Sequence, residues 1–195
     1  MPGMATLIAS RLEVCFVERG FLEPSVDELR DASAVSLRTL YKYFASREAM
    51  VVGALEHRHQ RYLDFIEREA PENGAESLAH VFGRIEAWMK SECGTGCLFL
   101  NALAAHPSNS DIRAVVVRQK NETRSLLGRC AGRPDLADAL FLLHEGATAA
   151  WPLMGGEATR AAKDSALKLL VDGGHACKPP PVSDNEPAET ETGPC

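Results

Sequence analysis

A short stretch of the sequence, residues 36–50, combines cations, phenols and a hydroxyl in a way that suits contact with nucleic acid. Ser36 is a favoured N-cap, and Leu40 with Phe44 forms an i, i+4 apolar pair, so we expect a helix with one buried face. Its other faces carry five polar or basic side chains: Arg38, Thr39, Tyr41, Lys42 and Tyr43. Cations attract phosphate oxygens, and hydroxyl groups hydrogen-bond to them and fix the register on a duplex. The pattern predicts a DNA-contacting helix, although a solvated amphipathic helix would show it too.

A second, shorter helix is expected just before this stretch. Ser25 and Glu28 have the Ser-x-x-Glu spacing of a capping box, so a helix can begin there and continue through Leu29 to about residue 32. Residues 33–35 then form a three-residue turn. A helix, a short turn and a basic, aromatic second helix predict a helix-turn-helix, whose second helix lies in the major groove.

The same residues resemble a known family. Three segments follow one another in order: Glu-Arg-Gly-Phe at 18–21, Ser-Val-x-x-Leu at 25–29, and Val-Ser-x-x-Thr-Leu-Tyr-x-Tyr-Phe-x-Ser-Arg-Glu-Ala at 35–49. Residues 5–50 thereby resemble the N-terminal DNA-binding domain of the TetR family of transcriptional regulators. The resemblance implies an all-α, dimeric, ligand-responsive regulator, in which a linking helix joins the DNA-binding domain to a helical sensor.

Three positions depart from the family pattern. Ala34 stands where the family usually has glycine, and it costs ~1 kcal/mol if its backbone must be left-handed. Arg30 occupies a position that is usually small and buried. Residues 1–6 contain no cation, so the basic arm often found ahead of the first helix is absent.

The resemblance and the residue types together suggest a set of DNA contacts. Phosphate contacts are expected from Ser25, Tyr41, Lys42 and Arg47. Side chains near base edges are expected to be Leu37, Arg38, Thr39 and Tyr43, with Ser36 at the start of the same helix. A solvated surface charge is the alternative reading of Arg47.

Composition and charge limit the function classes. The chain has 195 residues, of which 45% are hydrophobic and 25% charged, and no apolar run approaches the ~20 residues that cross a bilayer. Because no signal-peptide pattern is present, we expect a cytoplasmic protein. The net charge of −6 argues against coating of nucleic acid over a wide surface. Residues 1–50 hold six Lys and Arg against seven Asp and Glu, a net of −1, so DNA binding would depend on a small patch and on salt.

Apolar periodicity and breaker residues predict about nine helices and three regions. Beyond the two helices above, we expect helices at 5–19, 46–69, 76–91, 97–105, 109–130, 135–154 and 158–171. The regions are a helix-turn-helix domain at 1–50, a ligand-binding and dimerisation domain at 51–171, and an acidic, proline-rich tail at 172–195 that should be disordered. The helix from residue 46 links the first two.

The last two expected helices indicate a homodimer. Residues 135–154 are nearly apolar all round, and residues 158–171 are rich in alanine and leucine, so both need cover on several sides. A four-helix interface with a second copy would supply it. Two DNA-reading helices about 34 Å apart could then read a palindromic operator.

The family resemblance and the placement of aromatic residues together predict an effector pocket among the sensor helices. Its candidate residues are Phe82, Trp88, Phe99, His144 and Trp151. Each aromatic could equally be plain core, and His144 could be a core histidine with its hydrogen bonds satisfied.

Cys93 and Cys97 are the best candidates for thiol chemistry. One Cys-x-x-x-Cys with His106 nearby is weak evidence for zinc, so inert or core thiols and a redox pair are the other readings, and no metal or cofactor is predicted. No nucleophile elbow, phosphate loop, dinucleotide fingerprint or His-Glu-x-x-His occurs, and we do not expect an enzyme.

The resulting hypothesis is a ligand-responsive, dimeric DNA-binding regulator, with repression favoured, that a small-molecule effector releases from its operator. The alternative is a helical small-molecule or thiol-redox sensor that has lost DNA binding.

Overall fold

The computed structural model describes residues 3–92 and 96–172, and its regular structure there is entirely helical. The α-helices are α1 (Met4–Arg19), α2 (Val26–Ser33), α3 (Leu37–Tyr43), α4 (Arg47–Glu67), α5 (Gly74–Glu92), α6 (Leu98–Ala105), α7 (Ser110–Cys130), α8 (Ala137–Met154) and α9 (Gly156–Asp172), with a 3-10 turn, η1 (Pro134–Leu136), before α8. The all-α fold and its nine helices, as counted over this described part, are confirmed. The tail expected at 172–195 lies outside the described residues, apart from Asp172 at the end of α9.

Side-chain caps fix where several helices begin. Ser25 and Glu28 form the capping box in full: the Ser25 Oγ accepts from the Glu28 amide, and the Glu28 carboxylate accepts from the Ser25 amide. Ser36, Ser46 and Asn109 each accept a hydrogen bond from the backbone amide three residues on, at the starts of α3, α4 and α7. These caps satisfy amides that a helix leaves unpaired at its N-terminus, which is why serines marked the boundaries in the sequence.

The turn between α2 and α3 holds a strained residue. Ala34 has φ 50° and ψ 44°, in the left-handed region. A Cβ atom is disfavoured there, and glycine avoids the penalty. The energetic cost that was expected for a left-handed alanine therefore applies to Ala34.

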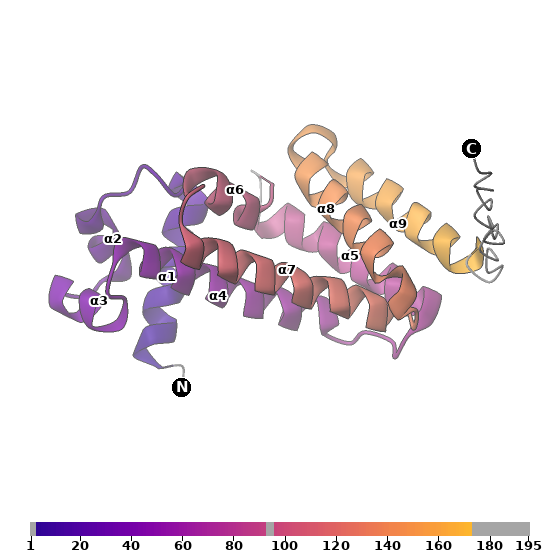
Figure 1. Ribbon diagram of the computed structural model, residues 1–195, viewed down its shortest axis with the longest axis horizontal. Coiled ribbons are helices and arrows are strands. Elements are labelled where there is room, and N and C mark those ends of the chain that lie inside the picture. Colours follow the sequence, from indigo (N-terminus) through magenta and orange to yellow (C-terminus); the bar gives the residue numbers. More distant parts are fainter. Residues whose placement is uncertain (1–2, 93–95, 173–195) are drawn as a thin grey trace, which may run out of the picture.

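The helices gather at two ends of an elongated molecule. Helices α1 to α3 lie at one end, α8 and α9 at the other, and α4 and α7 run along the length between them (Figure 1). One apolar cluster joins α1–α4 to α6 and the start of α7, through residues such as Leu12, Leu40 and Ile112. A second joins α4 and α5 to α7, α8 and α9. The first cluster includes residues on both sides of residue 50, so it marks no domain boundary there. The division of the chain at that residue stays a prediction.

Helix α3 approaches α4 very closely. A Cβ atom on Gly53 of α4 would overlap the ring of Phe44, the residue that ends α3. Glycine at this position thus permits the contact that sets how α3 sits against the linking helix α4.

Candidate functional site

Helix α3 turns its predicted DNA-contacting residues outward. Leu40 is fully buried and anchors the helix, whereas Arg38, Lys42 and Tyr41 are exposed, Tyr41 to 41%. Leu37 and Tyr43 are exposed as well, and Thr39 is half-buried beside Ser36, whose Oγ lies 2.8 Å from the Thr39 Oγ1. The buried and exposed faces therefore follow the i, i+4 pattern of the sequence.

The two cations of α3 are available to an outside anion. Among the described residues, neither Arg38 nor Lys42 has an acidic partner in an ion pair, and the Lys42 Nζ lies 5.6 Å from the centre of the Tyr43 ring. On α2, by contrast, Arg30 pairs with Asp27 and Asp31 at 2.7 Å each. The charge on α3 is thus unneutralised and exposed, as phosphate binding requires.

Two other predicted phosphate contacts already have partners within the protein. The Ser25 Oγ, although exposed, is hydrogen-bonded within the capping box to Glu28. The half-buried Arg47 guanidinium donates to the carbonyl oxygens of Phe21 and Pro24 and so ties the α1–α2 connection to the start of α4. The structure gives Arg47 this holding role, and its phosphate contact stays a prediction.

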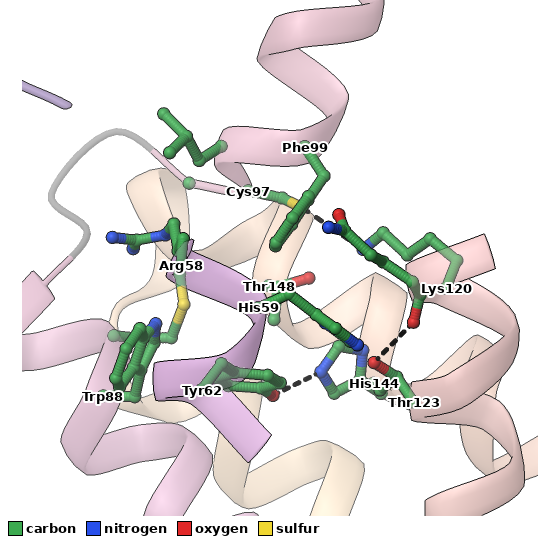
Figure 2. Close-up of a pocket in the computed structure, with 14 residues that line it drawn as sticks. Arg58, His59, Tyr62, Trp88, Cys97, Phe99, Lys120, Thr123, His144 and Thr148 are labelled. Carbon is green, nitrogen blue, oxygen red and sulfur yellow. Dashed lines mark hydrogen bonds between the residues drawn. The ribbon is translucent and has the colours of Figure 1, made fainter. Parts of the chain in front are cut away.

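A small cavity of about 40 Å³ lies between α4, α5, α6, α7 and α8, where side chains from all five helices converge (Figure 2). Its lining residues are Arg58, His59, Tyr62, Trp88, Met89, Gly96, Cys97, Leu98, Phe99, Gln119, Lys120, Thr123, His144 and Thr148. Of the predicted pocket residues, Trp88, Phe99 and His144 are among them.

Phe82 and Trp151 do not line this cavity and instead pack in the second apolar cluster. Phe82 lies six residues before Trp88 on α5, which is about 240° of helical rotation away. Trp151 lies two turns, about 10 Å, beyond His144 along α8. The structure therefore does not bring these two rings into this cavity, and their place in an effector pocket stays a prediction.

His144 is both hydrogen-bonded and part of the cavity wall. Its Nε2 lies 2.6 Å from the Tyr62 hydroxyl and its Nδ1 lies 2.9 Å from Glu145 (Figure 2). Burial lowers the pKa of His144, which favours the neutral ring. In that form the Tyr62 hydroxyl donates to Nε2 and the Nδ1 hydrogen is donated to Glu145. His144 is thus a buried histidine with both ring nitrogens hydrogen-bonded, and its contact with a ligand stays a prediction.

Lys120 completes this polar network. Its Nζ donates to Glu145 at 2.7 Å and lies 5.5 Å from the centre of the Phe99 ring. Burial raises the pKa of Glu145, but the hydrogen bond from His144 and the charge of Lys120 outweigh it, and the net shift is downward. The Lys120 side chain is only 15% exposed, because Glu145 and Phe99 of neighbouring helices enclose it.

The described cysteines differ in their surroundings. Cys97 is half-buried at the start of α6, and its Sγ accepts a hydrogen bond from the Lys120 Nζ at 3.3 Å. Burial raises the pKa of both Cys15 and Cys130, which keeps them protonated. Cys93 lies outside the described residues. Among the described residues, no group of three His, Cys, Asp or Glu side chains could hold a metal ion.

Sequence reasoning missed Arg58, which links the cavity to α1. Arg58 is 2% exposed, lies 5.1 Å over the Trp88 ring, and donates to Glu13 of α1 at 3.0 Å. His59, Gln119, Thr123 and Thr148 of the lining were missed as well. A charged residue inside an amphipathic helix reads as solvated unless its partners, here on α1 and α5, are known.

The far end of the molecule carries exposed apolar side chains. Leu142 and Leu153 of α8 are 69% and 89% exposed. Between α8 and α9 runs a groove lined largely by small residues, among them Gly146, Ala150 and Ala161. No helix in the described part of the chain is long and apolar enough to cross a membrane.

Comparison with known proteins shows what the N-terminal residues and the fold resemble. Residues 10–54 match the family model for bacterial regulatory proteins of the tetR family, whereas no curated protein sequence matches. Among solved structures, a TetR-family transcriptional regulator from Streptomyces coelicolor is similar with a TM-score of 0.73 and 19% identity, over 88% of this chain and 91% of that one. The reduced form of NemR from E. coli gives a TM-score of 0.66 and 22% identity, over 85% and 95%. A TetR transcription regulator from Haloarcula marismortui gives 0.70 and 12%, over 87% and 97%.

Proposed function

We propose that this chain, which belongs to the TetR family by its N-terminal domain and its fold, is a DNA-binding transcriptional regulator that represses its target genes until an effector binds. The observation that carries the proposal is the surface of α3. Arg38, Tyr41 and Lys42 are exposed there, and no acid neutralises the two cations within the described structure. Such a surface suits a helix in the major groove.

The proposed contacts divide by chemistry. Tyr41 and Lys42, with Ser25 and Arg47, would bind phosphate and fix the position of the helix on the duplex. Base edges would be read by the rest of the exposed surface, which comprises Ser36, Leu37, Arg38, Thr39 and Tyr43. Arginine suits this role because its guanidinium donates two parallel hydrogen bonds to guanine.

Two copies of the chain would bind one palindromic operator. The exposed Leu142 and Leu153, and the shallow small-residue groove between α8 and α9, support an interface in which these helices pack against their mates. Small residues allow such helices to approach closely. The two α3 helices would then lie about one DNA turn apart.

The cavity between α4 and α8 is the proposed effector site. A ligand shifts an equilibrium only by its unequal affinity for the two states, and a ~100-fold preference gives about 2.7 kcal/mol. Arg58 provides a contact from the cavity wall to Glu13 of α1. A ligand that moves this wall would therefore displace the DNA-binding helices.

DNA binding is tested with the duplex that flanks the protein's own gene, by fluorescence anisotropy over a series of salt concentrations. In a dimer, Lys42→Ala removes two phosphate contacts, so the slope of log affinity against log salt should fall by about 1.8. Binding should weaken equally for all sequences. Arg38→Ala should instead relax the preference at one base position per half-site.

Lys90→Ala is the matched control, since Lys90 is an exposed lysine that pairs with Glu86 on α5, and the label of α5 lies well away from that of α3 (Figure 1). It should leave the slope unchanged. If Lys42→Ala has the wild-type slope, Lys42 does not contact phosphate. If the wild-type protein does not bind the duplex even at low salt, the DNA-binding proposal is wrong.

A second candidate is a thiol-redox sensor that does not bind DNA. It is favoured by the Lys120 hydrogen bond to the Cys97 Sγ at 3.3 Å, since a cation beside a partly exposed thiol promotes its reactivity. Peptide mapping after brief alkylation should then find Cys97 modified before Cys15 and Cys130. Absence of DNA binding together with this selectivity would favour the second candidate.

A further inference from the structure

One residue that lines the cavity has a buried acceptor without a hydrogen-bond partner in the described part of the chain. Gln119 of α7 is 1% exposed and lines the cavity, and its Oε1 makes no hydrogen bond within the described structure. Its amide nitrogen donates to the Glu56 carboxylate at 3.4 Å, and Arg118 also pairs with Glu56. Because a carboxylate accepts only from the amide nitrogen, this contact fixes which end of the amide is the oxygen. An unpaired buried acceptor has lost its water without gaining a partner, and a donor in the cavity would compensate for that loss.

Two threonines of the wall also present acceptor oxygens only. A threonine hydroxyl has one hydrogen, and Thr123 and Thr148 give theirs to the carbonyl oxygens of Gln119 and Glu145 at 3.1 and 3.2 Å. Their oxygens can therefore only accept from a ligand. Lys120 gives two of its three hydrogens to Glu145 and to the Cys97 Sγ. Gln119, Thr123 and Thr148 thus offer three acceptor oxygens, which suit a ligand that donates.

The apolar part of the wall indicates the body of that ligand. The rings of Trp88 and Phe99, with Met89 and Leu98, supply flat and apolar surface. Arg58 lies over the Trp88 ring and Lys120 lies near the Phe99 ring. Each ring therefore already has a cation of the protein beside it. A cationic ligand would be repelled by these two side chains, and a carboxylate or phenolate has no hydrogen to donate to the Gln119 Oε1, which would stay unpaired. A neutral aromatic molecule meets neither penalty.

The volume limits the size of the ligand. About 40 Å³ accommodates one or two waters, so even one aromatic ring must move part of the wall to enter. A single ring requires the smallest displacement.

We infer that the cavity binds a neutral, single-ring aromatic molecule of the phenol or aniline class, whose O–H or N–H donates to the Gln119 Oε1. The inference rests on the proposed function, since it specifies the ligand class of the proposed effector site.

The experiment compares phenol with fluorobenzene, which has a similar shape and no donor, by calorimetric and ligand-observed NMR titration of the purified full chain. Phenol should bind at least about fivefold more tightly, which corresponds to one net hydrogen bond. Gln119→Met keeps a similar length and removes the acceptor, so the two ligands should bind this variant alike. Gln60→Met, at an exposed glutamine of α4 that is hydrogen-bonded to Asp64, should keep the wild-type preference.

Each outcome decides the inference. Equal binding of the two ligands to the wild type, binding of neither, or a preference that persists in Gln119→Met would overturn it. The wild-type comparison decides alone if Gln119→Met does not fold. Anisotropy with operator DNA is read separately. Phenol that binds through Gln119 without weakening DNA binding would contradict effector release and leave the ligand assignment standing.

Discussion

The left-handed Ala34 is a single residue that costs the protein stability. Its φ of 50° and ψ of 44° place the Cβ atom in a disfavoured region at the turn of the helix-turn-helix. Ala34→Gly should raise the free energy of unfolding by about 0.5 kcal/mol, since relief of a strain of about 1–2 kcal/mol exceeds the added chain entropy of glycine, about 0.4–1 kcal/mol. Urea denaturation measures the change as a higher midpoint with the same slope.

The matched control is Ala87→Gly. Ala87 is exposed within α5, where the same substitution should lower stability by about 1 kcal/mol because glycine is a poor helix former. Opposite signs for the two variants would establish that backbone conformation decides the effect. A loss of stability in both would contradict the strain at Ala34.

Single residues also show where sequence reasoning succeeds. The exposure of Tyr41 and Lys42 and the burial of Leu40 follow from helical periodicity within seven residues. The enclosure of Lys120 and the unpaired Gln119 oxygen do not follow from it. They depend on side chains of α4, α6 and α8, which the fold alone brings together.

Helices were more predictable than their contacts. Ser25, Ser36 and Ser46 mark helix starts through hydrogen bonds to amides at most three residues away, so the signal lies within the segment itself. The pairing of α1 with α4 through Glu13 and Arg58 joins residues 45 positions apart. No local pattern carries that information, and an isolated acid and an isolated arginine both read as surface residues.

The Arg58 guanidinium holds three helices together. It is buried, donates to Glu13 of α1, and lies over Trp88 of α5. Arg58→Met should cost about 3 kcal/mol of unfolding free energy, because it removes the most deeply buried counter-charge of Glu13 and leaves that carboxylate to the more exposed Arg61 and His57. Urea denaturation followed by circular dichroism measures this loss.

Arg124→Met provides the comparison for this variant. Arg124 pairs with Asp138 on the surface, where both side chains are largely exposed, so its removal should cost less than about 1 kcal/mol. If Arg58→Met were no more destabilising than Arg124→Met, the buried pair would not be what fastens α1 to α4.

The whole molecule has its proposed DNA-reading end and its proposed dimer face at opposite ends (Figure 1). A substitution in the dimer face therefore cannot touch α3 directly. Leu142→Asp places a charge on an exposed apolar position of α8 and should convert the dimer to a monomer, as measured by size-exclusion chromatography with light scattering.

The same substitution should greatly weaken DNA binding. Two linked DNA-binding domains bind about 100-fold or more tightly than one, because the second binds at a high effective concentration. A monomer loses this gain although its α3 is intact. Val117→Asp adds the same charge at an exposed apolar position of α7 and should preserve both the dimer and the affinity. If Leu142→Asp stayed dimeric, the interface would lie elsewhere. If it became monomeric and still bound the operator with wild-type affinity, one DNA-binding domain would be enough for binding. The requirement for two α3 helices one DNA turn apart would then be wrong.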